Sequence, residues 1–99
     1  MSKPFAVNDT TQAIECLCHF NKALAVHTWS LVQKCREVCL DFRDYLKKAK
    51  EIPGNYLTKR CHVSMLKGRV AGLTDGLVIA GAISPAQAEL LCDFAYALN

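Results

Sequence analysis

The sequence predicts an all-α fold in a single domain of 99 residues, and three observations support this prediction. Residues 9–51 contain no glycine or proline and place apolar residues at alternating spacings of three and four, the period of a packed helix. Residues 63–80 repeat that spacing, and a serine–proline pair opens a third periodic segment. We therefore expect a long N-terminal helix packed against a second helix and a short C-terminal helix, in a three-helix bundle.

The first predicted helix spans residues 9–51, after a lead-in at residues 1–8. Asp9 is a good N-cap, and Gln12 stands where the partner of a capping box would stand. Unbroken, a helix of about 42 residues would be about 63 Å long, which is long for such a small chain. A break near residues 20–23 is the alternative, and it would give four helices.

The N-terminal part of this long helix has no predicted neighbour within the chain. A second helix at residues 56–82 would be about 24 Å shorter, which leaves the apolar row at residues 9–22 exposed. Such a row is typical of a subunit or partner contact, and a polar residue within it often fixes the register. The sequence thus favours an intertwined homodimer. The alternative is that the helix bends and covers this row itself, and that apolar residues outside the row are buried as ordinary core. The predicted partner or dimer contacts are Ile14, Leu17, Phe20, Asn21, Val26 and Trp29.

A turn is predicted at residues 52–55, and the second helix at residues 56–82 carries a small residue at every fourth position. These small residues are Ser64, Gly68, Gly72, Gly76 and Ala80. Three glycines inside a helix cost about 3 kcal/mol relative to alanine, so we expect close packing against another helix to offset that cost. The alternative is a break at Asp75–Gly76 followed by a short strand at residues 77–83.

The last predicted helix spans residues 84–98 and has the clearest start signal. Ser84 is the N-cap, Pro85 takes the first helical position, and Gln87 completes a capping box. The preceding corner, Ala80 to Pro85, is similar to that of many small helical accessory proteins of bacteria and their mobile elements. Its residues are those of any tight helix–helix corner, so no family is assigned.

The six cysteines are predicted to be reduced thiols of a cytoplasmic protein, because no charged leader followed by an apolar stretch opens the sequence. One set could ligate zinc: Cys35, Cys39, Cys61 and His62. No Cys-x-x-Cys pair accompanies it, and two of its cysteines fall on the inward row, where cysteine behaves as a small apolar residue. We expect no metal, no other cofactor and no membrane span.

Positive charge is concentrated in residues 47–69, which hold seven lysines and arginines against one glutamate, while the whole chain has a net charge of +3. The basic residues are Lys47, Lys48, Lys50, Lys59, Arg60, Lys67 and Arg69. The predicted turn would bring them to one end of the bundle, where they could contact nucleic-acid phosphates. A solvated helix end is the plainer interpretation, because few aromatic residues are interleaved and no recognition helix is present.

The sequence contains no glycine-rich phosphate loop, no H-E-x-x-H and no G-x-S-x-G motif. An apolar content of 52% without recognisable catalytic spacing favours a non-enzymatic helical binding protein: a regulator, inhibitor or adaptor, with a bacterial mobile element as one expected origin. A protein partner and a homodimer are both expected. The alternative is a basic dimer that binds nucleic acid through residues 47–69.

Overall fold

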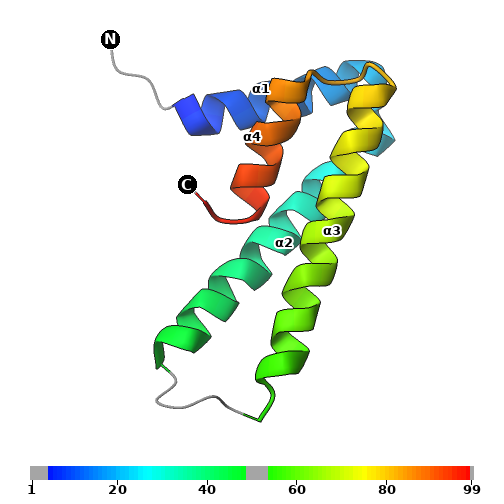
Figure 1. Ribbon diagram of the computed structural model, residues 1–99. Helices are drawn as coiled ribbons and strands as arrows, with labels where there is room; N and C mark the ends of the chain where they lie inside the picture. Colours follow the sequence, from blue (N-terminus) through cyan, green and yellow to red (C-terminus); the bar gives the residue numbers. More distant parts are fainter. Residues whose placement is uncertain (1–4, 49–53, 99) are drawn as a thin grey trace.

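The computed structural model describes residues 5–48 and 54–98, and within them the chain forms four α-helices and no strand. The helices are α1 (Phe5–Phe20), α2 (Lys22–Lys48), α3 (Tyr56–Ile79) and α4 (Pro85–Ala95) (Figure 1). The predicted all-α class is confirmed. The predicted lead-in is shorter than expected, because α1 begins at Phe5 and already contains Asp9. Lys50 and residues 52–53 of the predicted turn lie outside the described residues.

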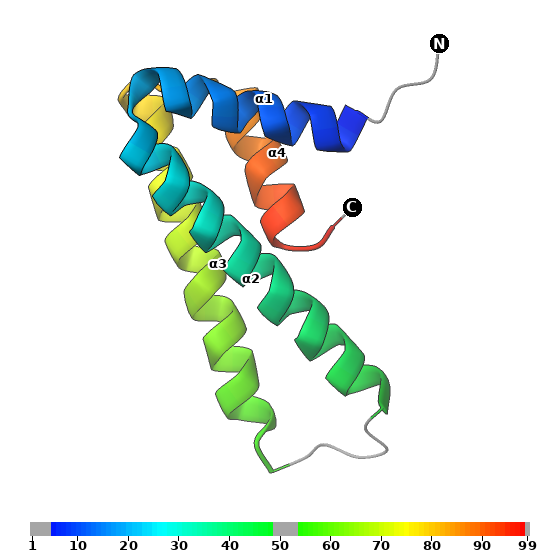
Figure 2. The same cartoon turned by 180° about the vertical axis from the view of Figure 1, so that it is seen from behind.

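The α2 and α3 helices form an antiparallel pair, and α1 lies across one end of it (Figures 1 and 2). The short α4 fills the angle beneath α1 and contacts all three other helices. It reaches only part of the way along the pair, so the far half of α2 and α3 extends beyond it. The described fold is accordingly elongated, with extents of 46 × 34 × 19 Å.

The unbroken helix predicted for residues 9–51 is wrong, and the break lies at Asn21, within the range given as the alternative. The backbone N–H of Leu24 donates a hydrogen bond to Oδ1 of Asn21 over 2.9 Å. Asn21 is therefore the N-cap of α2, since this bond satisfies one of the amide groups that the first turn leaves free. The helical direction changes there, although the three-four spacing of apolar residues continues without interruption.

This change of direction covers the apolar row that the sequence left exposed. Ala13 and Leu17 of α1 are both fully buried. They belong to an upper core with Ala25 of α2, Leu77 of α3 and Leu91 of α4. The last described helix therefore covers Ala13, Ile14 and Leu17 of the row that was expected to lie exposed, while Cys18 and Phe20 remain exposed.

A second core lies further along the α2–α3 pair. Its buried members include Val32, Cys35 and Cys39 of α2, with Leu66 and Val70 of α3. The α4 helix closes its upper side: the rings of Trp29 and Phe94 stack with centroids 5.7 Å apart. Buried polar residues are satisfied locally, as at Thr28, whose Oγ1 donates to the carbonyl of Leu24 over 2.8 Å.

The corner between α3 and α4 is held by a glycine in a left-handed conformation. Gly81 has φ of +76°, and the N–H of Ala82 donates to the carbonyl of Leu77 over 2.9 Å, the bond that closes a Schellman motif. The α3 helix therefore ends at Ile79, three residues earlier than predicted. The capping box of Ser84 and Gln87 is confirmed in both of its hydrogen bonds.

The α4 helix also ends three residues earlier than predicted, at Ala95. Arginines of α2 bind carbonyls at the end of α4 and just beyond it. Arg36 donates to the carbonyl of Phe94 over 2.7 Å, and Arg43 donates to that of Ala97, two residues past the helix, over 2.5 Å. The Arg36 guanidinium also lies 4.2 Å from the centroid of the Phe94 ring. Positive charge at a helix C-terminus is stabilising, so these arginines fix α4 against α2.

Candidate interaction surfaces

Two of the residues predicted to contact a partner are exposed at the corner between α1 and α2. Phe20 ends α1 and is 52% exposed, and Val26 in the first turns of α2 is 58% exposed. Ala23, between them in sequence, is also exposed. We call Phe20, Ala23 and Val26 the corner surface. Apolar side chains with this exposure are available to another molecule.

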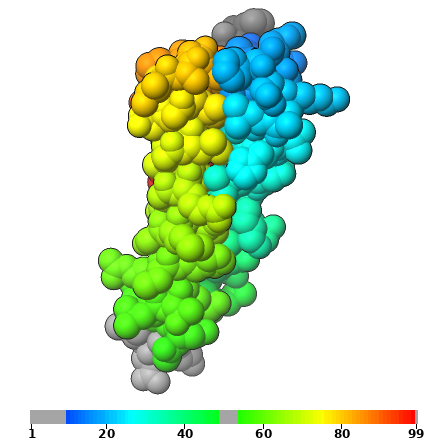
Figure 3. Space-filling model, turned by 90° about the vertical axis from the view of Figure 1, so that its right-hand side faces the viewer, coloured from blue at the N-terminus to red at the C-terminus, as the bar shows by residue number. Residues whose placement is uncertain are grey.

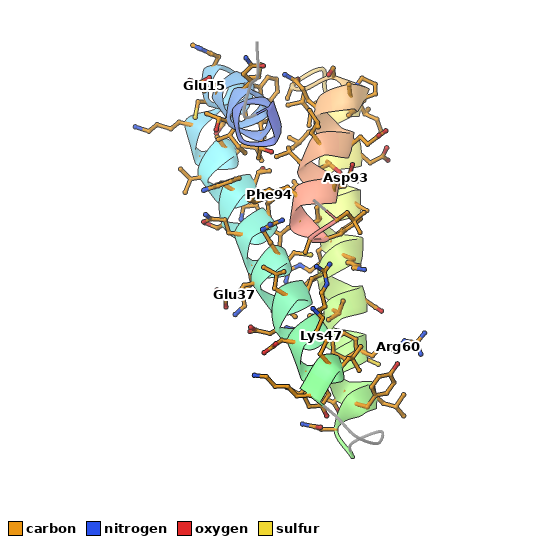
Figure 4. All side chains as sticks on the ribbon, turned by 90° about the vertical axis from the view of Figure 1, so that its left-hand side faces the viewer. Glu15, Glu37, Lys47, Arg60, Asp93 and Phe94 are labelled. Carbon is orange, nitrogen blue, oxygen red and sulfur yellow. The ribbon has the colours of Figure 1, made fainter. Side chains whose placement is uncertain are left out.

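The other predicted contact residues have roles within the fold. Leu17 is fully buried, and Ile14 packs against the upper core. Trp29 is half-buried and stacks on Phe94, which Figure 4 shows between α4 and α2. Asn21 is exposed and caps α2. Of these six residues, Phe20 and Val26 are thus the ones with large apolar side chains exposed to solvent.

The predicted basic cluster divides between two places. Lys47 and Lys48 end α2, while Lys59 and Arg60 lie in the first turns of α3, at the same end of the antiparallel pair. The two remaining described members, Lys67 and Arg69, lie further along α3. Arg60 points away from the helix pair in Figure 4.

Several of these cations already have partners within the chain. Lys48 forms an ion pair with Asp44 over 3.0 Å, and the ammonium of Lys59 lies 4.8 Å from the Tyr45 ring centroid. The half-buried Lys67 lies 5.3 Å from the ring centroid of Tyr96. Lys47, Arg60 and Arg69 are exposed. The cluster therefore provides a moderately positive end rather than a continuous basic groove.

An aromatic group that the sequence analysis did not identify joins α2 to α3 near this end. The ring centroid of Phe42 lies 6.3 Å from the ring centroid of Tyr45 and 5.8 Å from that of Tyr56. The hydroxyl of Tyr45 also forms a hydrogen bond with Oδ1 of Asn55. Next to it, a hollow of about 210 Å³ is lined by Val38, Asp41, Phe42, Lys59, His62 and Val63. The signal was present in the sequence as aromatic residues on both sides of the turn.

The row of small residues on α3 lies at the surface. Ser64, Gly68, Gly72, Gly76 and Ala80 are all exposed, and a Cβ built at each of the three glycines meets no atom within 4 Å. The close neighbour expected from the sequence is thus not supplied by any described part of this chain. Figure 3 views the molecule with α3 running along its surface. The role of these glycines is not explained by the packing of one chain.

The predicted interpretation of Cys35 and Cys39 as core residues is confirmed, since both are buried, whereas Cys61 and His62 are exposed on α3. Burial raises the pKa of the Cys35 thiol to about 12, and the neighbouring Cys39 adds to the shift. Within residues 5–48 and 54–98, no three His, Cys, Asp or Glu side chains gather closely enough to hold a metal ion.

Comparison with protein-family models, curated proteins and solved structures finds no significant match to this chain. None of the helices in the described part combines the length and the apolar character required to cross a membrane.

Proposed function

We propose that this chain is a non-enzymatic helical binding protein that acts on a protein partner as a regulator, inhibitor or adaptor. The observation that carries this proposal is the exposure of Phe20 and Val26 at the corner surface. Both side chains stand on a bend that the Asn21 cap holds, so a partner would meet them already in position. Aromatic anchors on a preorganised surface are enriched among residues that dominate protein–protein affinity.

A matched set of variants tests this function by affinity capture from a lysate of the source organism. Phe20→Glu and Val26→Glu place charge on the corner surface, whereas Gln33→Glu places it on an exposed site of α2 elsewhere. We expect the wild-type chain and Gln33→Glu to retain the same protein and the corner variants to lose at least about tenfold of it. Circular dichroism and thermal melts establish that all four chains are folded.

Equal capture by all four chains would contradict the assignment of the corner surface. Trp29 is a poor choice for such a test, because its stacking on Phe94 makes any substitution a change in stability as well.

A second candidate function is nucleic-acid binding, favoured by the gathering of Lys47, Lys48, Lys59 and Arg60 at one end of the α2–α3 pair. Phosphate contacts release counterions, so binding would weaken steeply as salt rises. In gel-shift titrations, Lys47→Gln and Arg60→Gln should each weaken binding and flatten the salt dependence. No shift at low salt rejects this function and leaves the first proposal untouched.

A further inference from the structure

The N-terminal half of α3 carries a short apolar strip on the side that faces away from α2. Leu57 is 69% exposed, Met65 is 52% exposed, and Cys61 between them is also exposed. Val70, on the opposite side of the helix from Cys61, is buried in the core shared with α2. The three exposed residues line one shallow hollow. They follow at intervals of four, so Leu57 and Met65 lie about 40° to either side of Cys61 around the helix axis. We call these three residues the α3 strip.

Positive charge flanks the α3 strip on both sides. A helix turns about 100° per residue, so Arg60 lies about 100° to one side of Cys61 and Arg69 about 80° to the other. Both arginines are exposed, and neither forms an ion pair with a carboxylate of the described residues. Arg60 points away from the helix pair in Figure 4. Residues 56–74 contain no aspartate or glutamate, so the charge beside the strip has one sign.

The positive flanks end before the C-terminal half of the helix. Asp75 is exposed and projects within about 40° of the direction of Cys61. The exposed side chain of Ile79 lies beyond this carboxylate and is separated from the α3 strip by it. The combination of open apolar side chains with cations alone is therefore confined to residues 57–69.

An apolar strip with cations at its borders is complementary to a surface with an apolar interior beneath negative groups. An anionic bilayer has this arrangement, because acyl chains lie beneath phosphate and carboxylate headgroups. Arginines at the borders reach the headgroups while the aliphatic side chains enter between the acyl chains. A helix in the plane of the headgroups needs neither the length nor the apolar character of a spanning helix, so this contact agrees with the absence of such a helix from the described part of the chain.

The type of open side chain favours lipid over nucleic acid. Bases of a single strand stack on aromatic rings, but the rings of Phe42, Tyr45 and Tyr56 near this end pack against one another. The α3 strip itself presents aliphatic and sulfur-containing side chains. They give a base no ring to stack on, whereas leucine and methionine transfer favourably from water into an apolar environment.

We propose that the N-terminal half of α3 docks on an anionic lipid surface. Leu57 and Met65 enter below the headgroups, and Arg60 and Arg69 bind the negative groups of the lipids on either side. This inference goes beyond the proposed function, because the α3 strip is a different face from the corner surface and needs no protein partner.

Vesicle flotation with the full chain tests the apolar contact. Vesicles of equal parts phosphatidylcholine and phosphatidylserine should carry the chain, and vesicles of phosphatidylcholine alone should not, because two inserted side chains need the added attraction of charge. Leu57→Gln and Met65→Gln should each weaken binding about tenfold. Val26→Gln also removes an exposed apolar side chain, but from the corner surface. It is the matched control and should bind as the wild type does.

The charged contact is tested with the same vesicles. Arg60→Gln and Arg69→Gln should each weaken binding about fivefold, and binding of the wild type should weaken as salt rises. Lys22→Gln removes the same charge at an exposed site at the start of α2 and should have little effect. All of these substitutions are at exposed positions, and circular dichroism establishes that each variant is folded.

A chain that stays unbound at low salt in the presence of phosphatidylserine vesicles would overturn the proposal. Binding that Leu57→Gln and Met65→Gln leave intact would also overturn it, since the contact would then be one of charge alone, as at a nucleic-acid site. Phe20→Glu should bind vesicles as the wild type does, so this test and the partner-capture test fail independently.

Discussion

At the scale of single residues, the polar side chains on the inward row show what sequence spacing cannot resolve. The spacing placed Asn21 and Thr28 among apolar residues, and a polar residue in such a row often fixes the register of a dimer. Both instead satisfy backbone groups of their own helix, Asn21 by accepting from Leu24 and Thr28 by donating to it. Asparagine and threonine compete for local backbone hydrogen bonds wherever they occur. A polar residue at a position predicted to face inward can fix the register of an interface, or it can form a hydrogen bond with the backbone of its own helix. Only the path of the backbone distinguishes these two explanations.

Cys35 gives a prediction at this scale. Burial raises the pKa of its thiol from 9.0 to about 12, so the unfolded chain loses this proton at lower pH than the folded chain. The stabilisation is fully present below about pH 9 and is lost as the pH rises towards about 12. For one such group, each rise of one pH unit in this range lowers the free energy of unfolding by at most about 1.4 kcal/mol.

Urea denaturation at several pH values between about 8 and 11 measures this slope. Cys35→Val should flatten it while Cys61→Ala, at an exposed thiol, should not. Tyr96, whose pKa burial also raises to about 12, supplies a remaining slope above its ordinary pKa of 10.0. Superimposable pH profiles for the wild type and Cys35→Val would contradict the assignment.

At the scale of helices, an end was predictable where several residues signalled the same boundary and was not where one signal stood alone. The start of α4 was predictable because Ser84, Pro85 and Gln87 all indicate that the helix begins directly after Ser84. The end of α1 was harder, because the apolar spacing runs across Asn21 without a change of phase. The position of α3 was predictable from its apolar row, yet its glycines are tolerated at the surface rather than buried as expected.

The Asn21 cap gives a prediction for the joint between α1 and α2. Asn21→Ala removes the acceptor of the Leu24 N–H and should lower the free energy of unfolding by about 1 kcal/mol. For a domain of this size the melting temperature should fall by about 5 °C. Asn21→Asp keeps an acceptor oxygen at the same site, so it serves as the matched control and should remain close to the wild type. Thermal melts with equal shifts for both substitutions would exclude capping as the role of Asn21.

At the scale of the whole molecule, the two ends of the α2–α3 pair are not equally covered. The upper core draws on all four helices, whereas the far half of the α2–α3 pair extends beyond α4 and is joined by Phe42, Tyr45 and Tyr56. Helix lengths estimated from the sequence placed the uncovered part at residues 9–22, whereas the structure buries Ala13 and Leu17 there and leaves the far half of α2 and α3 beyond α4. The direction that α1 takes relative to α2 could not be predicted, because the apolar spacing does not change at the break.

Unequal coverage predicts unequal hydrogen exchange. Backbone amides of α2 after Cys39 and of α3 before Val63 should exchange faster than those around Val32 and Val70, because local opening there exposes less apolar surface. Exchange followed by NMR at individual amides measures the difference. Uniform protection along both helices would mean that the pair opens as one unit with the upper core.

The contact between α1 and α4 also bears on how the protein is made. Leu17 leaves the ribosome well before Leu91, with which it shares a core. The apolar face of α1 must therefore wait until α4 has been synthesised, and during that interval it is open to chaperones or to the same segment of another nascent chain. The hairpin of the middle two helices has no such delay, since its own residues supply its contacts as they emerge.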